Sequence, residues 1–200
     1  SKKLLAENSE GLIVTSSGLK GEITYYASIG DYKNAELVAL EYKNFFKDNF
    51  YLEIQNHTLS EELASHEILS KISKNHSILL VATNDTRYTF KEDAIDYEVM
   101  SCIGLGVHLN SPQKSKALPP EYYIKSSDEM YKLFSEYPEA LTNTVKIAEQ
   151  CNVDIPTGEL FLPQFPIPKK SNSENANQYL EELCDKAARK KYKKIDTIIS

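Results

Sequence analysis

Residues 78–83 read ILLVAT, an apolar run without a charged side chain. A strand with one solvent face alternates apolar and polar residues, whereas a continuous run is typical of a parallel strand covered on both faces. Two shorter β-favouring runs, Leu12–Thr15 and Phe50–Ile54, precede it, and a helical pattern stands before each later run. The order strand–helix–strand–helix–strand predicts an α/β fold with a parallel sheet.

The helices carry start signals that can be read locally. Asp31 can cap a helix whose apolar residues recur at three- and four-residue spacing. Ser60 is expected to cap the next helix with its hydroxyl, ahead of carboxylates in the first turn, where the helix dipole favours negative charge. Further along, Ser126 and Glu129 fit a capping box, and Pro138 suits the first turn of another helix.

The composition is that of a globular chain: 41% of the 200 residues are hydrophobic, 26% are charged, and the net charge is −6. No apolar run approaches the roughly 18 residues of a membrane helix, and the sequence opens without a leader, so we expect no membrane contact and a cytoplasmic location. The acidic balance argues against nucleic-acid binding over most of the surface. The three cysteines form no CxxC pair, so neither a zinc cage nor a disulfide framework is expected.

Four prolines between Pro156 and Pro168 indicate a linker that packs in an extended form, and a helical pattern follows from Glu174 to Lys191. A strand-like run begins soon after Ser1, and a new apolar pattern is starting where the sequence stops. We therefore expect the chain to be an excerpt from a longer protein.

Seven stretches of the sequence, in one order and with compatible spacing, resemble the alpha (catalytic) subunit of bacterial DNA polymerase III. Any one of them would be a weak match, but the ordered set covers nearly the whole chain. The stretches are GLIVTSSGLKGEI (11–23), FYLEIQNH (50–57), LLVATNDTRY (79–88), KEDAIDYEVMSCIG (91–104), YYIKSSDEMYKLFSEYPEALTNTVKIAEQCNV (122–153), FLPQFPIP (161–168) and YLEELCDKAARKKY (179–192).

The resemblance implies a division of the chain into three parts. Residues 1–158 would be the later part of the PHP domain, a distorted (β/α)7 barrel in this family. Residues 159–170 would be a proline-rich linker, and residues 171–200 the mostly helical start of the polymerase palm. The family's polymerising carboxylates, which hold two Mg²⁺ ions for nucleotidyl transfer, would lie beyond residue 200. The resemblance thus implies a DNA-directed DNA polymerase as the parent, and a segment without catalytic residues, cofactor or activity of its own.

PHP barrels of related proteins hold up to three metal ions at the carboxyl ends of their strands. Where the family commonly has a cysteine ligand this chain has Gly18, and where it commonly has a histidine ligand this chain has Arg87, while Asp85 matches its motif. Glycine offers no ligand atom, and a guanidinium has no lone pair to give. Asp85 is either a residual metal ligand or, as we favour, the ion-pair partner of Arg87, so we expect a vestigial metal site.

Glu53, Gln55 and His57 share one face of a strand by its two-residue period. They could act as metal ligands or as a general base, or form a polar network in the barrel interior. The network is the favoured interpretation, because the family does not mark these positions as ligands. The remaining histidines are expected at the surface or at helix ends: His66, His76 and His108.

A basic cluster near the end of the sequence includes Lys190, Lys191, Lys193 and Lys194. These lysines either contact the backbone of template DNA or form the solvated face of a helix, and the sequence leaves both interpretations open.

Two functions follow as hypotheses from the resemblance. In the first, the segment is a metal-free PHP scaffold of the replicative polymerase that docks the proofreading exonuclease subunit, joins other holoenzyme subunits and braces the polymerase core, while the parent chain binds DNA. In the second, it belongs to an active metal-dependent PHP phosphoesterase with 3′–5′ exonuclease activity. The missing ligands at Gly18 and Arg87 favour the first.

Overall fold

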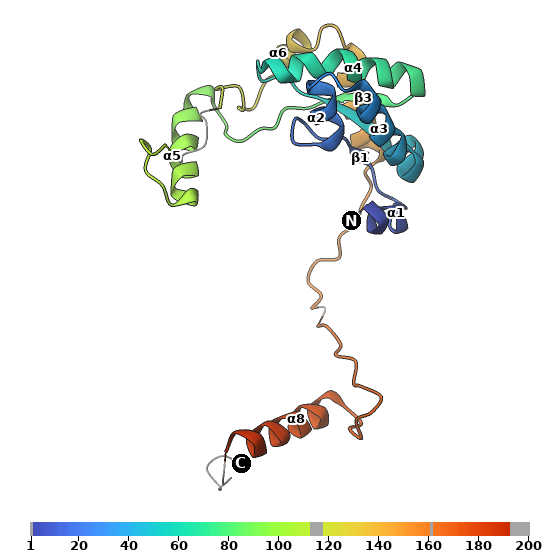
Figure 1. Cartoon of the computed structure of the whole chain (residues 1–200), viewed down its shortest axis with the longest axis vertical. Helices are drawn as coiled ribbons and strands as arrows, with labels where there is room; N and C mark the ends of the chain where they lie inside the picture. Colours follow the sequence, from blue (N-terminus) through green and yellow to red (C-terminus); the bar gives the residue numbers. More distant parts are fainter. Residues whose placement is uncertain (1, 113–117, 161, 193–200) are drawn as a thin grey trace. The chain divides into compact units, whose positions relative to one another are not determined.

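The computed structural model describes residues 2–112, 118–160 and 162–192. The chain divides into two units, residues 1–152 and residues 153–200, each with its own internal contacts (Figure 1). The first unit holds the sheet, and the second holds one long helix, α8 (Ala176–Lys191).

Three parallel strands form the sheet in the order β1-β2-β3: β1 (Val14–Thr15), β2 (Phe50–Ile54) and β3 (Leu79–Ala82). Val14 pairs with Phe50, and Ile54 pairs with Ala82, so β2 and β3 end level with one another. The predicted α/β fold with a parallel sheet is confirmed, and the predicted run 50–54 coincides with β2. The distorted (β/α)7 barrel needs strands beyond these three and stays a prediction.

The two faces of β2 differ in chemistry, although all five residues of the strand are buried. Phe50, Leu52 and Ile54 lie on one face, by the strand's two-residue period, and belong to the apolar core. Glu53 lies on the other face, where polar groups of β1 and of the residues after β3 meet it.

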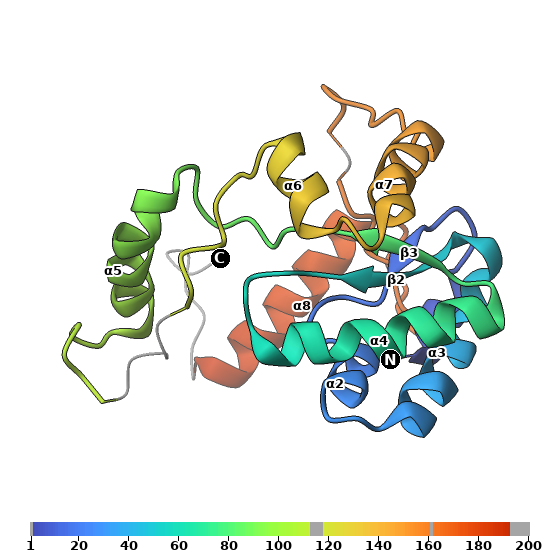
Figure 2. The same ribbon diagram turned by 90° about the horizontal axis from the view of Figure 1, so that it is seen from above.

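Helices pack against the apolar face of β2 and complete the core. Figure 2 shows α4 running along β2, and α7 packs on β3. Asn143 of α7 is buried and donates from Nδ2 to the carbonyl oxygen of Leu80 at 2.8 Å, which ties the helix to the strand. The helices that supply core side chains are α2 (Glu22–Ser28), α3 (Tyr32–Phe46), α4 (Ser60–His76) and α7 (Pro138–Gln150).

Most of the predicted helix starts are confirmed. The Asp31 side chain accepts a hydrogen bond from the Asn34 amide at 3.1 Å, and Ser126 and Glu129 form the reciprocal capping box. The prediction for Ser60 was wrong: α4 begins at Ser60 itself, with Leu59 in the cap position. The Ser60 hydroxyl donates to the neighbouring Glu61 carboxylate at 2.8 Å, and from inside the first turn it accepts no capping bond from a backbone amide.

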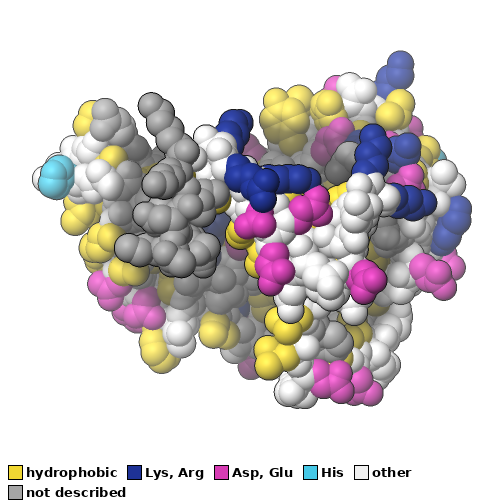
Figure 3. All heavy atoms as spheres, turned by 90° about the horizontal axis from the view of Figure 1, so that it is seen from below, with side chains coloured by type: hydrophobic (Ala, Val, Ile, Leu, Met, Phe, Trp, Pro, Cys, Tyr) yellow, Lys and Arg dark blue, Asp and Glu magenta, His cyan; other side chains and the backbone are white. Residues whose placement is uncertain are grey.

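Helix α5 (Ala94–Leu105) stands apart from the sheet in Figures 1 and 2. Cys102 is its one buried residue. Apolar side chains such as Ile95 and Ile103 are exposed, and Figure 3 shows apolar surface at the edge of the molecule where α5 lies. The turn η2 (Lys91–Asp93) leads into α5, and α6 (Ser127–Leu133) follows it.

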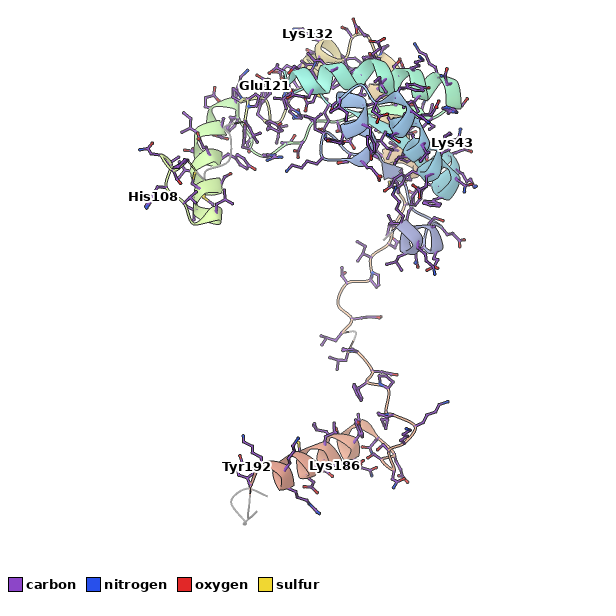
Figure 4. All side chains as sticks on the ribbon, viewed as in Figure 1. Lys43, His108, Glu121, Lys132, Lys186 and Tyr192 are labelled. Carbon is purple, nitrogen blue, oxygen red and sulfur yellow. The ribbon has the colours of Figure 1, made fainter. Side chains whose placement is uncertain are left out.

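Two shorter elements, α1 (Lys2–Glu7) and η1 (Lys47–Asn49), complete the first unit. Before and after α5 the chain runs side by side with itself, because Tyr88 forms a parallel bridge with Tyr123. Glu121, labelled in Figure 4, lies on the returning segment and pairs with Lys91 at 2.6 Å.

The second unit has no buried residue among those that the structure describes. Its helix α8 begins at the Asn175 cap, whose side chain accepts from the Gln178 amide at 3.0 Å. Within the linker, Phe165 stacks on Tyr179 of α8 with ring centroids 5.8 Å apart. The proposed domain boundaries at residues 158 and 170 stay predictions.

Candidate functional site

The residues that follow the three strands meet around one cavity of about 610 Å³. Gly18 comes from the end of β1, Gln55 from the end of β2, and Asp85 and Arg87 from the segment after β3. Parallel strands bring their carboxyl ends to one edge of the sheet, which explains why positions so far apart in sequence line the same hollow. Glu62 of α4 and Tyr122 complete the wall next to these strand ends.

The Glu53 carboxylate is the centre of a hydrogen-bond network in this wall. It is 8% exposed and accepts from the Thr15 hydroxyl at 2.6 Å, from the Gln55 amide at 2.7 Å and from the Thr83 hydroxyl. A buried carboxylate is costly unless donors surround it, and here three strand ends supply them. With its oxygens committed to these donors, Glu53 links the strands together.

His57 does not join the Glu53 network. The strand ends at Ile54, so the two-residue period no longer holds at position 57, and the imidazole turns toward α4 instead. Its Nδ1 lies 2.7 Å from Glu62 Oε1, its backbone amide donates to Glu62 Oε2 at 2.6 Å, and its ring stacks on Tyr122 at 3.9 Å. The structure thus connects two of the three predicted network residues and gives the third a different partner.

The His57 side chain is fully buried, and its Nε2 has no hydrogen-bond partner among the described residues. Nδ1 faces the Glu62 carboxylate, so the Glu62 side chain fixes the orientation of the ring. His57 itself is not one of the residues that line the cavity.

His66 is buried too, against the expectation of a surface position. Its Nε2 lies 2.8 Å from the Gln55 carbonyl oxygen, and its ring is 5.7 Å from that of Tyr137. The missed signal was helical spacing, since His66 follows the buried Glu62 by four residues and precedes the buried Leu69 by three.

Gly18 stands against the Gln55 side chain. A Cβ atom built on Gly18 would lie 2.1 Å from Gln55 Oε1, well inside van der Waals contact. The amide therefore occupies the space where a side chain at position 18 would project, and any such side chain requires Gln55 to move aside.

Arg87 and Asp85 form the ion pair that the sequence suggested. The Arg87 Nη2 and Nε donate to Asp85 Oδ2 at 2.7 and 3.2 Å. Nη1 donates to the Tyr97 hydroxyl at 2.8 Å, and the guanidinium lies over the Tyr122 ring at 4.9 Å from its centroid. Burial acts to lower the pKa of Arg87, but the bonds to Asp85 and Tyr97 outweigh it and hold the pKa above its ordinary value.

The residues present do not fit the metal cluster that PHP barrels carry. Gly18 offers no ligand, Asp85 is paired with a permanent cation, and the Glu53 oxygens are taken by donors from three strand ends. Among the described residues no three His, Cys, Asp or Glu side chains are grouped closely enough to hold a metal ion.

A second cluster lies just outside the cavity, around Tyr123. Its hydroxyl donates to Glu129 at 2.6 Å, and Lys125 lies over its ring at 4.4 Å. The hydrogen bond to Glu129 raises the pKa of Tyr123 to about 12, while the same bond, with those from Ser126, lowers the pKa of Glu129 to about 2. Desolvation lowers the pKa of Lys125, whose side chain is 2% exposed.

The basic cluster is only partly within the described chain. Lys190 and Lys191 end α8 and are exposed, whereas Lys193 and Lys194 lie outside the described residues. Cations suit the last turn of a helix, where the dipole is negative, so their position alone does not select the DNA interpretation. No helix in the described part of the chain has the length and apolar character needed to cross a membrane.

Comparison with known proteins agrees with this architecture. A family model described as PHP domain matches residues 1–57. The chain is 36% identical to the DNA polymerase III subunit alpha of Campylobacter jejuni over 98% of its length, covering 18% of that protein. It is 37% identical to the subunit of the same name from Treponema pallidum, over 95% of the chain and 16% of that protein.

A third relative, the DNA polymerase III subunit alpha of Pseudomonas fluorescens, is 41% identical over 84% of the chain and 14% of its own length. The chain thus spans less than a fifth of the curated relatives it matches, and it matches each of them over most of its own residues. By sequence, this chain belongs to the family of bacterial DNA polymerase III alpha subunits.

Proposed function

We propose that the chain is a segment of a replicative DNA polymerase, and that its parent performs template-directed DNA synthesis in the cytoplasm as the alpha subunit of a DNA polymerase III holoenzyme. The observation that carries this proposal is the match over 98% of the chain to a protein of that name. The parent would use Mg²⁺ held by carboxylates outside these 200 residues, so the segment itself would contribute no catalytic group.

Within that parent the segment serves as a metal-free scaffold that docks the proofreading exonuclease subunit and braces the polymerase core. Support comes from the strand ends, where the Arg87 guanidinium pairs with Asp85 and the Gln55 amide abuts Gly18. Hydrogen bonds and an ion pair, rather than metal ions, connect these strand ends, and this supports a role that needs no metal.

Elemental analysis of the purified parent subunit tests the metal-free part. We expect no stoichiometric zinc or manganese after dialysis against metal-containing buffer. One equivalent of bound metal that is lost in an Asp85→Asn variant would overturn the proposal. The matched control is Glu159→Gln, a change to a carboxylate in the extended segment.

Docking is tested by mixing the purified parent subunit with the purified exonuclease subunit and measuring complex formation by analytical ultracentrifugation. Crosslinking followed by mass spectrometry should then join the exonuclease to residues 1–152. Crosslinks confined to other parts of the parent would defeat the docking role while leaving the polymerase assignment intact.

The alternative function, a metal-dependent phosphoesterase with 3′–5′ exonuclease activity, has one observation in its favour. The cavity lies at the carboxyl ends of the strands and is lined by Glu53, Glu62 and Asp85. A nuclease assay on the intact parent with Mn²⁺ or Zn²⁺ decides the matter. We expect no 3′-end degradation, and activity abolished by Asp85→Asn would establish the alternative.

The second unit is proposed to lead into the polymerase palm, with its terminal lysines next to DNA as one interpretation and a solvated helix face as the other. Filter binding by the parent at several salt concentrations separates them. If Lys190, Lys191, Lys193 and Lys194 contact phosphates, changing all four to Gln reduces the salt dependence of DNA affinity by about one unit per lost contact. An unchanged slope leaves the solvated face.

A further inference from the structure

We infer that Arg87 is a positioning residue whose guanidinium clamps helix α5 to the strand ends. The side chain reaches partners on three segments of the chain. Asp85 lies on the segment after β3, Tyr97 lies on α5, and Tyr122 lies on the segment that returns toward α6.

Each contact uses a different part of the guanidinium. Nε and Nη2 share Asp85 Oδ2, Nη1 donates to the Tyr97 hydroxyl at 2.8 Å, and the flat face lies over Tyr122. The planar five-donor fork of arginine permits this division, whereas a lysine ammonium cannot reproduce both the paired bonds and the stacking. The backbone adds a fourth link, because the Arg87 amide donates to the Tyr122 carbonyl oxygen at 2.8 Å.

Tyr122 extends the clamp into the core of the first unit. Tyr122 is 5% exposed, and its ring stacks on the fully buried His57, which is hydrogen-bonded to Glu62 of α4. The guanidinium therefore connects α5 with a buried part of the sheet layer rather than with another surface loop.

Helix α5 depends on such a connection, because its own packing is slight. Cys102 is its one buried residue, while Ile95 and Ile103 are 71% and 67% exposed. Burial of apolar area stabilises a helix in proportion to the area removed from water, so this helix gains little in that way. Tyr97 meets the body twice, through Arg87 and through the Tyr88 ring at 5.6 Å.

The clamp presupposes the metal-free site proposed above, since an ion on Asp85 would compete with the guanidinium. Two readouts keep the two ideas apart. Metal content reports on the site, and hydrogen–deuterium exchange of the α5 amides reports on the clamp, both measured on the same samples of the intact parent protein.

The decisive variants are Arg87→Ala, Arg87→Lys and Tyr97→Phe. Hydrogen bonds to charged groups contribute enough that Arg87→Ala should speed α5 exchange about tenfold, and Tyr97→Phe about threefold. Arg87→Lys should restore only part of the protection. Exchange in β2 and α4 should stay unchanged, and Arg189→Ala, the loss of the other arginine, should leave α5 unaffected.

Unchanged α5 exchange in both Arg87→Ala and Tyr97→Phe would overturn the inference and reduce Arg87 to the local partner of Asp85. If Arg87→Ala does not fold, Tyr97→Phe decides alone, because it removes a single hydroxyl. Full protection in Arg87→Lys would also count against the clamp, since charge alone would then suffice.

Discussion

Strand β2 and helix α8 are held in place by opposite means. Every residue of β2 is buried, and its apolar face is part of a core built from four helices. Helix α8 has no buried residue and is fixed by its Asn175 cap, by a Glu182–Lys186 pair and by the linker ring of Phe165. The first unit is therefore stabilised mainly by packing of its core. The second unit is stabilised by local contacts, several of them polar, which pH and salt can change.

The largest effect should come from Leu52→Ala in β2. Leu52 is fully buried, so the change should lower the free energy of unfolding of the first unit by about 3–4 kcal/mol through lost burial and a cavity. Urea denaturation followed by circular dichroism measures it. Leu180→Ala on α8 is the control, since Leu180 is 59% exposed and should change stability by less than about 0.5 kcal/mol.

Glu53→Ala should rank second, at about 2 kcal/mol, because it leaves the donors of Thr15, Gln55 and Thr83 without their acceptor. The same denaturation experiment applies. A more stable variant would mean that burying the Glu53 carboxylate costs more free energy than its hydrogen bonds contribute. The polar face of β2 would then need another explanation.

The helix caps Ser126 and Asn175 allow a matched comparison, with smaller expected changes in stability. Ser126→Ala should destabilise the first unit by about 1 kcal/mol, since Met130 and Leu133 of α6 pack against the core. Asn175→Ala should reduce the helicity of α8, seen in its NMR chemical shifts, without moving the denaturation midpoint of the first unit. A shifted midpoint in Asn175→Ala would show that the second unit contributes to the stability of the first.

The subtlest contrast lies in two carboxyl groups whose pKa values are both lowered to about 2. Hydrogen bonding to Lys186 is the main cause for Glu182, with Ser171 and Ser173 adding to it, whereas the neutral Tyr123 hydroxyl is the main cause for Glu129. A carboxyl group whose pKa is lowered in the folded state stabilises that state at pH values above its ordinary pKa of about 4.3. This stabilisation is lost as the pH falls toward 2. α8 helicity should thus decline over this range.

Salt separates the two groups. Added 0.5 M NaCl, roughly the ionic strength at which charge pairs are strongly screened, should raise the pKa of Glu182 more than that of Glu129 in a carbon-detected NMR titration. Equal shifts would show that the Lys186 contact is not chiefly ionic.

The fold was largely readable from the sequence because its signals are local. The run 50–54 coincides with β2, and the Asp31 cap and the Ser126–Glu129 box form as predicted. The Ser60 prediction was wrong by one position, since α4 begins at Ser60 itself and Leu59 takes the cap position. Strand periodicity placed Glu53 and Gln55 side by side, because Gln55 directly follows the strand, but it failed at His57, three residues beyond the end of β2 at Ile54.

The candidate site was less predictable, because its missing members lie outside the stretches that the sequence marks as strand ends. Glu62 pairs with His57, while Tyr97 and Tyr122 meet Arg87 from positions 10 and 35 residues further along the chain. Neither tyrosine carries a pattern that marks it, because a stacking partner is chosen by tertiary geometry rather than by spacing.

The bond from Asn143 to Leu80 has a mechanical consequence. Sliding α7 along β3 by one helical turn would leave a buried amide and a strand carbonyl both unpaired, a penalty that a smooth apolar contact would not impose. The hydrogen bond therefore favours one position of α7 along β3. A force applied at the carboxyl end of α7 should therefore displace α7 and β3 together.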